Sequence, residues 1–337
     1  MDILLNQLLD GLPTLVLALI IAVMLFILGK GADLLVDQAV KLSLYWGVPE
    51  IIIGATIISI GTTLPEASVS VLAAVSGQSG LSLGNGIGSV IANTGLILGI
   101  TVILGKIPID RKLVNRQGFI MVAANLAIVM VSLPFLTRTA GGTVSRFSGF
   151  VFVALLFIYI YTSIKWSRKG YQSVAVNSDL SEKPDHLSIL PTLFKMAGGI
   201  AAIIVSSKIL ISSVEITAVR IGIPQSVIAS TLIAFGTSLP ELILALQAIR
   251  KGHGELALGN IVGANILNIL FVIGVSAAVT SGGLSVPAGY YSLQYPALLI
   301  MMSVFTVFTR RHHQNIHKAA GYLLFGLYIL YLLLNYL

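Results

Sequence analysis

The chain has 337 residues, of which 56% are hydrophobic and only 10% are charged, and its mean hydropathy is +0.96. A soluble domain carries roughly a quarter charged residues, so this composition indicates a membrane protein with several spans. The absence of cysteine excludes disulfides, thiolate metal sites, iron–sulfur clusters and thiol nucleophiles. The net charge of +7 comes from basic residues in short loops, which favours orientation in a membrane over nucleic-acid binding.

Ten apolar segments are long enough to cross a membrane, because about 20 helical residues span a hydrocarbon core of about 30 Å. The first five cover 13–40, 48–76, 81–105, 117–136 and 146–166, and the second five cover 191–219, 224–250, 256–280, 291–309 and 317–336. We therefore predict an all-α membrane protein of ten transmembrane helices, with a five-helix repeat at 1–166, a cytoplasmic connector at 167–190 and a second five-helix repeat at 191–337.

The basic residues of the loops indicate how the chain is oriented. With the N-terminus outside, 14 Lys and Arg residues fall in cytoplasmic segments and 3 fall on the opposite side. This bias follows the positive-inside rule, so we expect the N-terminus and the C-terminus to lie outside. A monomer is compatible with these features.

The two halves carry the same motifs at an offset of 175 residues. Gly61–Glu66 is Gly-Thr-Thr-Leu-Pro-Glu, and Gly236–Glu241 is Gly-Thr-Ser-Leu-Pro-Glu. In both halves the glutamate is followed 27 residues later by an asparagine, Asn93 or Asn268. Because five spans is an odd number, the second half starts from the opposite side of the membrane. The sequence thus predicts an inverted-topology repeat, which in transporters places the substrate site near the midplane between the halves.

Each motif places a carboxylate, Glu66 or Glu241, near the middle of an apolar span. Carboxylates at such depth are costly and mark transport paths or relays. Pro65 and Pro240 have no N–H for the carbonyl four residues earlier, so we expect a kink or break in each helix. Carboxylates, hydroxyls, amides and freed carbonyls are hard oxygen ligands, which favour Ca²⁺, Na⁺ or Mg²⁺, and a flexible cage suits Ca²⁺ better than Mg²⁺.

Other polar residues in the spans have simpler interpretations. Single Ser, Thr or Asn residues in membrane helices are often interhelical hydrogen-bonding groups, and this is the favoured interpretation of Ser70, Asn85 and Asn260. Lys30 with Asp37 and Lys208 with Glu215 are each seven residues apart, and we expect a charge pair or a snorkelling contact at the end of a span, with ion entry as the less favoured alternative.

The paired Gly-Thr-Ser/Thr-Leu-Pro-Glu and Gly-Asn-x-x-Gly-x-x-x-x-Asn segments resemble the alpha repeats of the cation/Ca²⁺ exchanger superfamily, most closely those of prokaryotic Na⁺/Ca²⁺ exchangers. The resemblance implies a secondary antiporter, not an enzyme, in a prokaryotic plasma membrane. It implies exchange of Na⁺ for Ca²⁺ by alternating access, with spans two, three, seven and eight forming the ion sites and spans one and six sliding past them. Its partners are then the two ions and the lipid bilayer, without a cofactor.

The resemblance also implies roles for individual residues. Glu66 and Glu241 would be the carboxylates shared by Ca²⁺ and Na⁺, and the backbone oxygens of Thr62 and Thr237 would complete the Ca²⁺ site. The implied Na⁺ ligands are the carbonyls of Ser59 and Ala234, with Thr63, Ser89 and Ser238 as further candidates and Asn93 and Asn268 as a middle pair.

Two positions depart from the pattern of that superfamily. Asn268 stands where many Na⁺/Ca²⁺ exchangers have an aspartate, and Ala264 replaces a serine that could offer a hydroxyl to one Na⁺. Two ionised glutamates balance one Ca²⁺ or two Na⁺, whereas three Na⁺ would leave an unfavourable positive charge in a low-dielectric site. The hypothesis is that stoichiometry or ion selectivity differs from that of exchangers with the aspartate.

Three alternative functions fit the sequence less well than Na⁺/Ca²⁺ exchange. A Ca²⁺/H⁺ exchanger would carry protons on the same glutamates, and Ca²⁺ uptake driven by a pH gradient without Na⁺ would favour it. A passive channel fits less well, because a midplane site between broken helices suits alternating access better than a continuous pore. An intramembrane enzyme is disfavoured, because the spans contain no Ser/His pair, paired-aspartate motif or histidine zinc motif.

Overall fold

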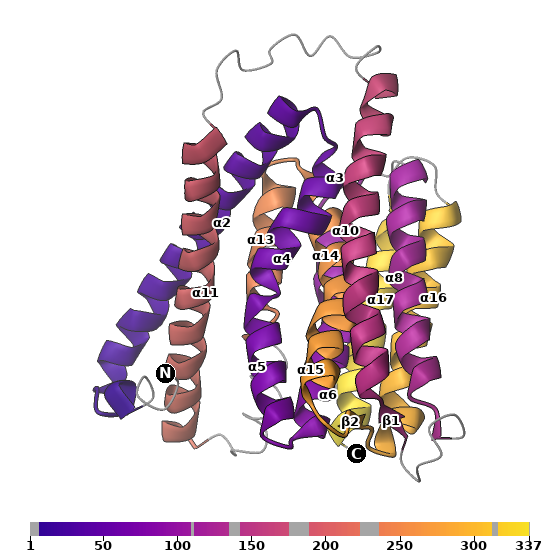
Figure 1. Ribbon diagram of the computed structural model, residues 1–337. Helices are drawn as coiled ribbons and strands as arrows, with labels where there is room; N and C mark the ends of the chain where they lie inside the picture. The colour runs from indigo at the N-terminus through magenta and orange to yellow at the C-terminus, as the bar shows by residue number, and fades with distance from the viewer. Residues whose placement is uncertain are drawn as a thin grey trace.

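The computed structural model describes residues 7–108, 111–134, 142–174, 189–222, 236–311 and 316–336. Over these residues the chain is a bundle of long helices, drawn in Figure 1. Two short strands, β1 (Thr143–Val144) and β2 (Leu284–Ser285), pair antiparallel with Thr143 opposite Ser285, and they link the segment before the last helix of the first half to the second half.

The helical elements follow the predicted order, and π-helical segments are labelled η. The first half contains α2 (Thr14–Trp46), α3 (Glu50–Ile53), η1 (Gly54–Ile58), α4 (Ser59–Thr62), α5 (Leu64–Val75), α6 (Ser79–Ala92), η2 (Asn93–Ile97), α7 (Leu98–Leu104), α8 (Arg111–Val131) and α10 (Arg146–Val174). The second half contains α11 (Ile189–Arg220), α13 (Leu239–Arg250), α14 (Gly254–Leu267), η3 (Asn268–Ile273), α15 (Gly274–Val279), η4 (Tyr290–Gln294), α16 (Tyr295–Arg311) and α17 (Lys318–Tyr336).

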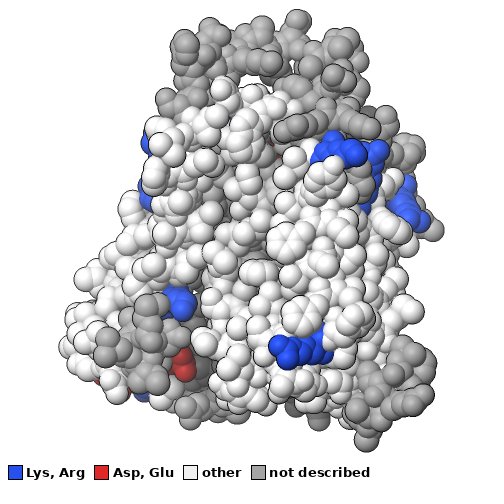
Figure 2. All heavy atoms as spheres, viewed as in Figure 1, with Lys and Arg blue, Asp and Glu red and all other residues white. Residues whose placement is uncertain are grey.

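Within the described residues, 8 helices are long and apolar enough to cross a membrane, or up to 9 if a bent pair counts as one span. The predicted span at 224–250 is represented by α13, because residues 223–235 lie outside the described part. The protein is therefore a helical membrane protein, as predicted, with up to nine of the ten expected spans described. Figure 2 agrees with this, since a band across the middle of the visible face carries no charged side chain.

Span two is broken beside Glu66. The part formed by α3, η1 and α4 meets α5 at an angle of 46°, and Thr63 lies at the break. Pro65 in the first turn of α5 has no N–H to donate to the carbonyl of Gly61, which ends the helix there. The predicted break in span two is thus confirmed, and Pro240 holds the same place in the first turn of α13.

Two glycines of α14 seat span eight directly against span two. A Cβ atom added at Gly263 would lie 2.5 Å from Cα of Ala55, and one added at Gly259 would collide with the backbone of Ile51. Only glycine allows helices to approach this closely. The close contact joins a helix of the second half to the broken helix of the first half, beside the predicted site residue Ser59.

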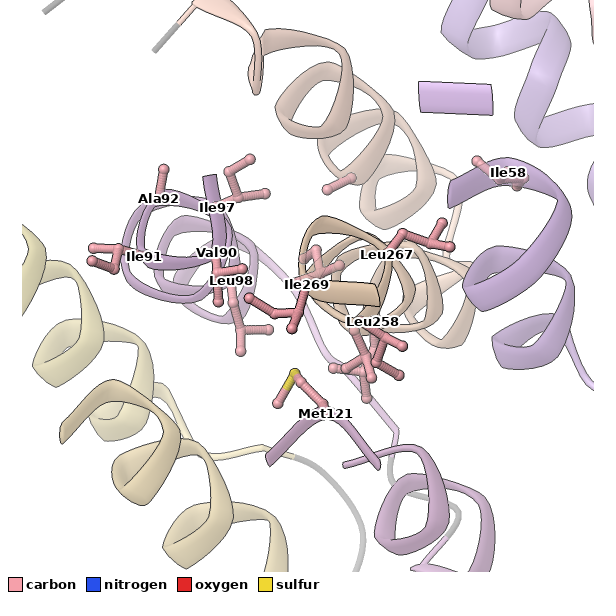
Figure 3. Packing of buried hydrophobic residues seen from close by; sticks show 14 of the residues in the cluster. Ile58, Val90, Ile91, Ala92, Ile97, Leu98, Met121, Leu258, Leu267 and Ile269 are labelled. Carbon is pink, nitrogen blue, oxygen red and sulfur yellow. The ribbon is translucent and has the colours of Figure 1, made fainter. Parts of the chain in front are cut away.

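The third and eighth spans form the centre of the bundle. The span at Ser79–Leu104 is 72% buried and the span at Gly254–Val279 is 89% buried, whereas the other long apolar helices of the described part are at most 39% buried. Figure 3 shows the apolar contact between them, where Ile269 lies near Val90 and Leu98 and Met121 of α8 closes the contact from one side. Helices from both halves therefore share one core.

The helices α2 and α11 lie side by side along much of their length (Figure 1). They approach most closely where Gly31 meets Gly199, since a Cβ at Gly31 would lie 3.1 Å from the carbonyl oxygen of Gly199. At one end, the Arg220 guanidinium of α11 donates to the carbonyl oxygens of Asp10 (2.6 Å) and Leu12 (2.7 Å) before α2. These contacts join α2 and α11 into a pair.

The opposite end of α2 is linked to α13. Lys251, which follows α13, has its Nζ 2.8 Å from Oδ1 of Asp37 and 3.3 Å from Oδ1 of Asp33. Of the roles expected for Lys30 and Asp37, the charge pair is therefore wrong, because Asp37 is bound by Lys251, and Lys30 instead lies over the ring of Phe26 at 5.7 Å. Residues seven apart on a helix share a face, but the closer partner comes from another helix.

Candidate cation site

The two predicted glutamates are buried at corresponding places in the two halves. Glu66 lies in the first turn of α5 and Glu241 in the first turn of α13, and their side chains are 1% and 0% exposed. A helix N-terminus favours a negative charge. The two carboxylates are close enough for their charges to interact. Within the described residues none of their four oxygens has a hydrogen-bond partner within 3.5 Å, although the Thr62 hydroxyl is near enough to Glu241 to interact with its carboxylate.

Several neighbouring polar atoms are also buried without a partner. Buried polar groups in proteins are nearly always hydrogen-bonded, so a group of unpartnered ones indicates a place where an ion or water is bound. Besides the carboxylates, the unpartnered atoms of predicted site residues are the hydroxyls of Thr63, Ser89 and Ser238 and both amide atoms of Asn93 and Asn268.

The remaining predicted site residues lie at the two breaks or next to them. Ser59 begins α4, and its carbonyl accepts the N–H of Thr63 at 2.9 Å. Thr62 ends α4, and Thr237 directly precedes the N-cap of α13. Ala234 lies outside the described residues. No group of three or more His, Cys, Asp or Glu that could hold a metal is found in the described part, so the candidate site has two carboxylates.

Hydrogen bonds cross between the halves at this site. The hydroxyl of Thr62 lies 3.4 Å from Oδ1 of Asn260, and the hydroxyl of Thr237 donates to Oδ1 of Asn85 at 3.3 Å. The amide nitrogen of Asn85 also donates to the Glu66 carbonyl at 3.0 Å and to the hydroxyl of Ser70, one turn later in α5, at 2.9 Å. Asn85 and Asn260 are thus interhelical hydrogen-bonding residues, as predicted, and each has a partner in the opposite glutamate motif, which the sequence did not indicate.

The two middle asparagines each begin a π-helical segment. Asn93 is the first residue of η2 and Asn268 is the first residue of η3. Such segments break the regular i→i−4 bonding and are frequent at functional sites. Sequence reasoning missed both segments, and the only signal they share is the asparagine at matching positions of the repeat.

One further polar contact near the site was missed. The amide of Asn265 donates to the hydroxyl of Thr94 at 2.8 Å, and both side chains are 1% exposed. The equivalent positions of the repeat, Val90 and Ile269, are apolar and lie in the core of Figure 3. The sequence signal for this contact is that Asn265 and Thr94 are polar at buried positions where the other half has an apolar residue.

Both glutamate motifs pack against the same helix. A Cβ added at Gly61 would lie 2.5 Å from Cδ1 of Ile200, and one added at Gly236 would lie 2.8 Å from Cδ1 of Ile211. Both isoleucines belong to α11, eleven residues apart, which is about 16 Å along a helix. The helix paired with α2 therefore contacts the site from both halves.

These features define a multi-pass membrane protein with a buried, acidic candidate site for a cation, as a cation transporter requires. The sequence model of the sodium/calcium exchanger protein family matches residues 16–165 and 192–337, so the chain belongs to this family. Members of the family are antiporters. The protein is therefore a transporter of the cation/Ca²⁺ exchanger superfamily and not an enzyme.

Individual relatives agree with the family assignment. The chain is 33% identical over 311 residues to the inner membrane protein YrbG of Escherichia coli (strain K12), covering 90% of this chain and 92% of that protein. It is 30% identical over 285 residues to the sodium/calcium exchanger MaX1 of Methanosarcina acetivorans, covering 77% and 81%. Among solved structures, the sodium-calcium exchanger NCX_Mj soaked with zero Na⁺ and Ca²⁺ is similar with a TM-score of 0.79 and 27% identity, covering 94% of this chain and 98% of that one.

Proposed function

We propose that this protein exchanges Na⁺ for Ca²⁺ across a prokaryotic plasma membrane, with the ions bound near the midplane between two inverted five-helix repeats. The observation that carries the proposal is the pair of buried, unpartnered carboxylates of Glu66 and Glu241. Two carboxylates in one apolar interior need a cation or protons to balance their charge. The similarity to MaX1, which is named a sodium/calcium exchanger, supports Na⁺ as the exchanged ion.

The proposed Ca²⁺ site consists of Glu66, Glu241 and the backbone oxygens of Thr62 and Thr237. The proposed Na⁺ ligands are the carbonyls of Ser59 and Ala234, the side chains of Thr63, Ser89 and Ser238, and the middle pair Asn93 and Asn268. The unpartnered hydroxyls and amides of this second group support it, because bound cations would satisfy their oxygens.

Alternating access would use the α2–α11 pair as the moving part. Hydrogen bonds of Arg220 join α11 to the residues before α2, and α11 contacts the glycines of both motifs. A shift of the pair would therefore change the packing against both glutamate motifs and the access of ions to the site. We also propose that both termini lie outside and that the ten predicted spans include one built around α13.

A second candidate is Ca²⁺/H⁺ exchange by the same two carboxylates. It is favoured by the amide at Asn268, because the site then has only two titratable groups, and protons could replace Na⁺ on both. The two candidates differ in the gradient that drives Ca²⁺ uptake.

The test is ⁴⁵Ca²⁺ uptake into proteoliposomes loaded with Na⁺, K⁺ or an acidic buffer. Outward Na⁺ is expected to drive uptake while K⁺ does not, and Glu66→Gln and Glu241→Gln are each expected to abolish it. Glu255→Gln is the matched control, because Glu255 lies in the first turn of α14 and outside the site. Uptake driven by protons alone would establish the second candidate, and normal uptake in either site variant would refute the site.

A further inference from the structure

Asn85 and Asn260 occupy the same position in the two repeats but are held differently. The Nδ2 of Asn85 donates to the Glu66 carbonyl at 3.0 Å and to Ser70 Oγ at 2.9 Å. The Nδ2 of Asn260 is buried without any partner within the described residues, although the side chain is 0% exposed. Rotating that amide by half a turn would exchange its nitrogen and oxygen but would still leave one of them unpartnered.

In the first half, the hydrogen bond from the Asn85 amide to the Ser70 hydroxyl acts as a tether for that amide. The second half lacks this tether for a reason that the sequence shows. Ser70, which bonds the Asn85 amide, corresponds to Ala245 in the second half, because the repeats are offset by 175 residues. Ser82, whose carbonyl accepts the Ser70 hydroxyl at 3.2 Å, corresponds to Ala257. Both alanines are fully buried. The first half therefore has a chain of hydrogen bonds that fixes its asparagine, and the second half has only methyl groups there.

The untethered amide lies on the face of α14 that carries the site. Asn260, Ala264 and Asn268 follow one another at intervals of four residues, so they lie along one face of the helix. Ala264 is the position at which the first half has Ser89, with its unpartnered hydroxyl. The second half thus lacks one oxygen on this face, and the amide one turn away is not fixed in orientation, because its Nδ2 has no partner within the described residues. The contact of Thr62 with Asn260 at 3.4 Å places that amide beside the glutamate motif of the first half.

We propose that Asn260 is a Na⁺ ligand, supplying its amide oxygen in place of the hydroxyl that Ala264 lacks, whereas Asn85 only positions the Glu66 turn. This inference rests on the proposed function, because it assumes that the site binds Na⁺. An amide oxygen has two lone pairs, so it accepts from Thr62 and binds a cation at once. It is neutral, so it adds a ligand without changing the charge of the site.

The test measures ion binding on the purified full-length protein, through the rise of its melting temperature with Na⁺ or Ca²⁺ in choline buffer. Asn260→Ala is expected to weaken the apparent Na⁺ affinity about tenfold, as for the loss of one good ligand, and to change the Ca²⁺ affinity less than about twofold. Asn260→Asp is expected to bind Na⁺ more tightly than Asn260→Ala, because it keeps an oxygen at that position. A purely structural role would predict the opposite, since a buried charge destabilises.

Two matched variants test the tether itself. Ala245→Ser introduces the hydroxyl that holds Asn85 in the first half, so it is expected to fix the Asn260 amide and to weaken Na⁺ binding while the asparagine remains. Ser70→Ala removes the tether of Asn85 and is expected to leave Na⁺ affinity unchanged. If Asn260→Ala does not fold, the Na⁺ affinity of Ala245→Ser decides whether Asn260 is a ligand. Unchanged Na⁺ affinity in Ala245→Ser overturns the proposal.

The outcomes separate this inference from the proposed function. Wild-type Na⁺ affinity in Asn260→Ala overturns the role of Asn260 while leaving Na⁺/Ca²⁺ exchange intact. Equal loss of Na⁺ and Ca²⁺ affinity also overturns it, because that result indicates a general disturbance of the site. A wild-type protein that binds Ca²⁺ but no Na⁺ refutes the proposed exchange itself.

Discussion

The ammonium of Lys251 lies 2.8 Å from a carboxylate oxygen of Asp37 and links the end of α13 to α2. Asp33, one turn earlier on α2, is the second carboxylate of the link at 3.3 Å. The repeat places Ser76 at the position of Lys251 in the first half. The α2–α11 pair is therefore held by charge at one end of the bundle, and the matching position near the other end is neutral.

The stability that this link contributes is expected to be small and independent of pH in the physiological range. Partial burial lowers the pKa of Lys251, but hydrogen bonds to Asp37 and Asp33 and the charges of these carboxylates outweigh it and raise the pKa above 10.5. A raised pKa means that the contribution is complete below the unfolded value of about 10.4 and is lost as the pH rises through the folded value. Lys251→Met should therefore lower stability by about 1 kcal/mol or less, equally at pH 6 and pH 9.

Melting curves of wild type, Lys251→Met, Asp37→Asn and the double variant measure this contribution as a coupling free energy. A coupling that vanished between pH 6 and pH 9 would contradict the assignment of the charge to Lys251. High salt is expected to reduce the coupling, because the pair is partly exposed.

Gly263→Ala is expected to destabilise the protein. Its new methyl group would lie 2.5 Å from Cα of Ala55, so α14 would have to move away from η1, and overpacking of this kind costs about 1–3 kcal/mol. Gly326→Ala is the matched control, because Gly326 also lies in a membrane helix but has nothing within 4 Å of an added Cβ. Thermal melting in detergent compares the two, and equal melting temperatures would show that the contact is loose.

The buried bond between Asn265 and Thr94 is expected to show strong non-additivity. Asn265→Val alone leaves the Thr94 hydroxyl without its donor, and Thr94→Val alone leaves the amide nitrogen only the weak acceptor Sδ of Met121 at 3.5 Å, at a cost of about 1–3 kcal/mol each. The double variant has apolar groups on both sides, as the first repeat has at Val90, so it is expected to recover most of the loss. Additive losses in a double-mutant cycle would exclude the bond as the cause.

The exchange is expected to be electroneutral, with two Na⁺ for one Ca²⁺, because the site has the two carboxylates Glu66 and Glu241 and an amide at Asn268. Ca²⁺ uptake into proteoliposomes held at different K⁺ diffusion potentials should then not depend on voltage. Asn268→Asp adds a carboxylate, and we expect it to make uptake voltage-dependent. A reversal potential that fits three Na⁺ for one Ca²⁺ in the wild type would contradict this prediction.

Much of the fold followed from the sequence because the signals for spans are local. Apolar length predicted the helices, and Pro65 predicted the break beside Glu66, since both effects act within a few residues. The π-helical starts at Asn93 and Asn268 did not follow, because an α-helix and a π-helix have the same apolar pattern. The partner of Asp37 was also missed, because a same-helix lysine and a distant one are equally compatible with the sequence.

The candidate site was likewise predictable only in part. The repeat identified Glu66 and Glu241 as a pair, because matching positions in two halves indicate a shared axis. It did not indicate that Thr62 and Asn260 meet, because contacts between the halves depend on how the repeats are docked. The difference between Asn85 and Asn260 likewise required the structure, since it depends on whether an amide has a neighbour.

Ile200 and Ile211 connect α11 to both glutamate motifs. Eleven residues is close to three turns of helix, so both side chains project from the same face, one onto the Gly61 turn and the other onto the Gly236 turn. Because a helix resists compression, a displacement along its axis reaches both turns at the same moment and by the same amount. The Gly61 turn and the Gly236 turn would then move together, so that one side of the candidate ion site cannot open without a corresponding movement on the other side.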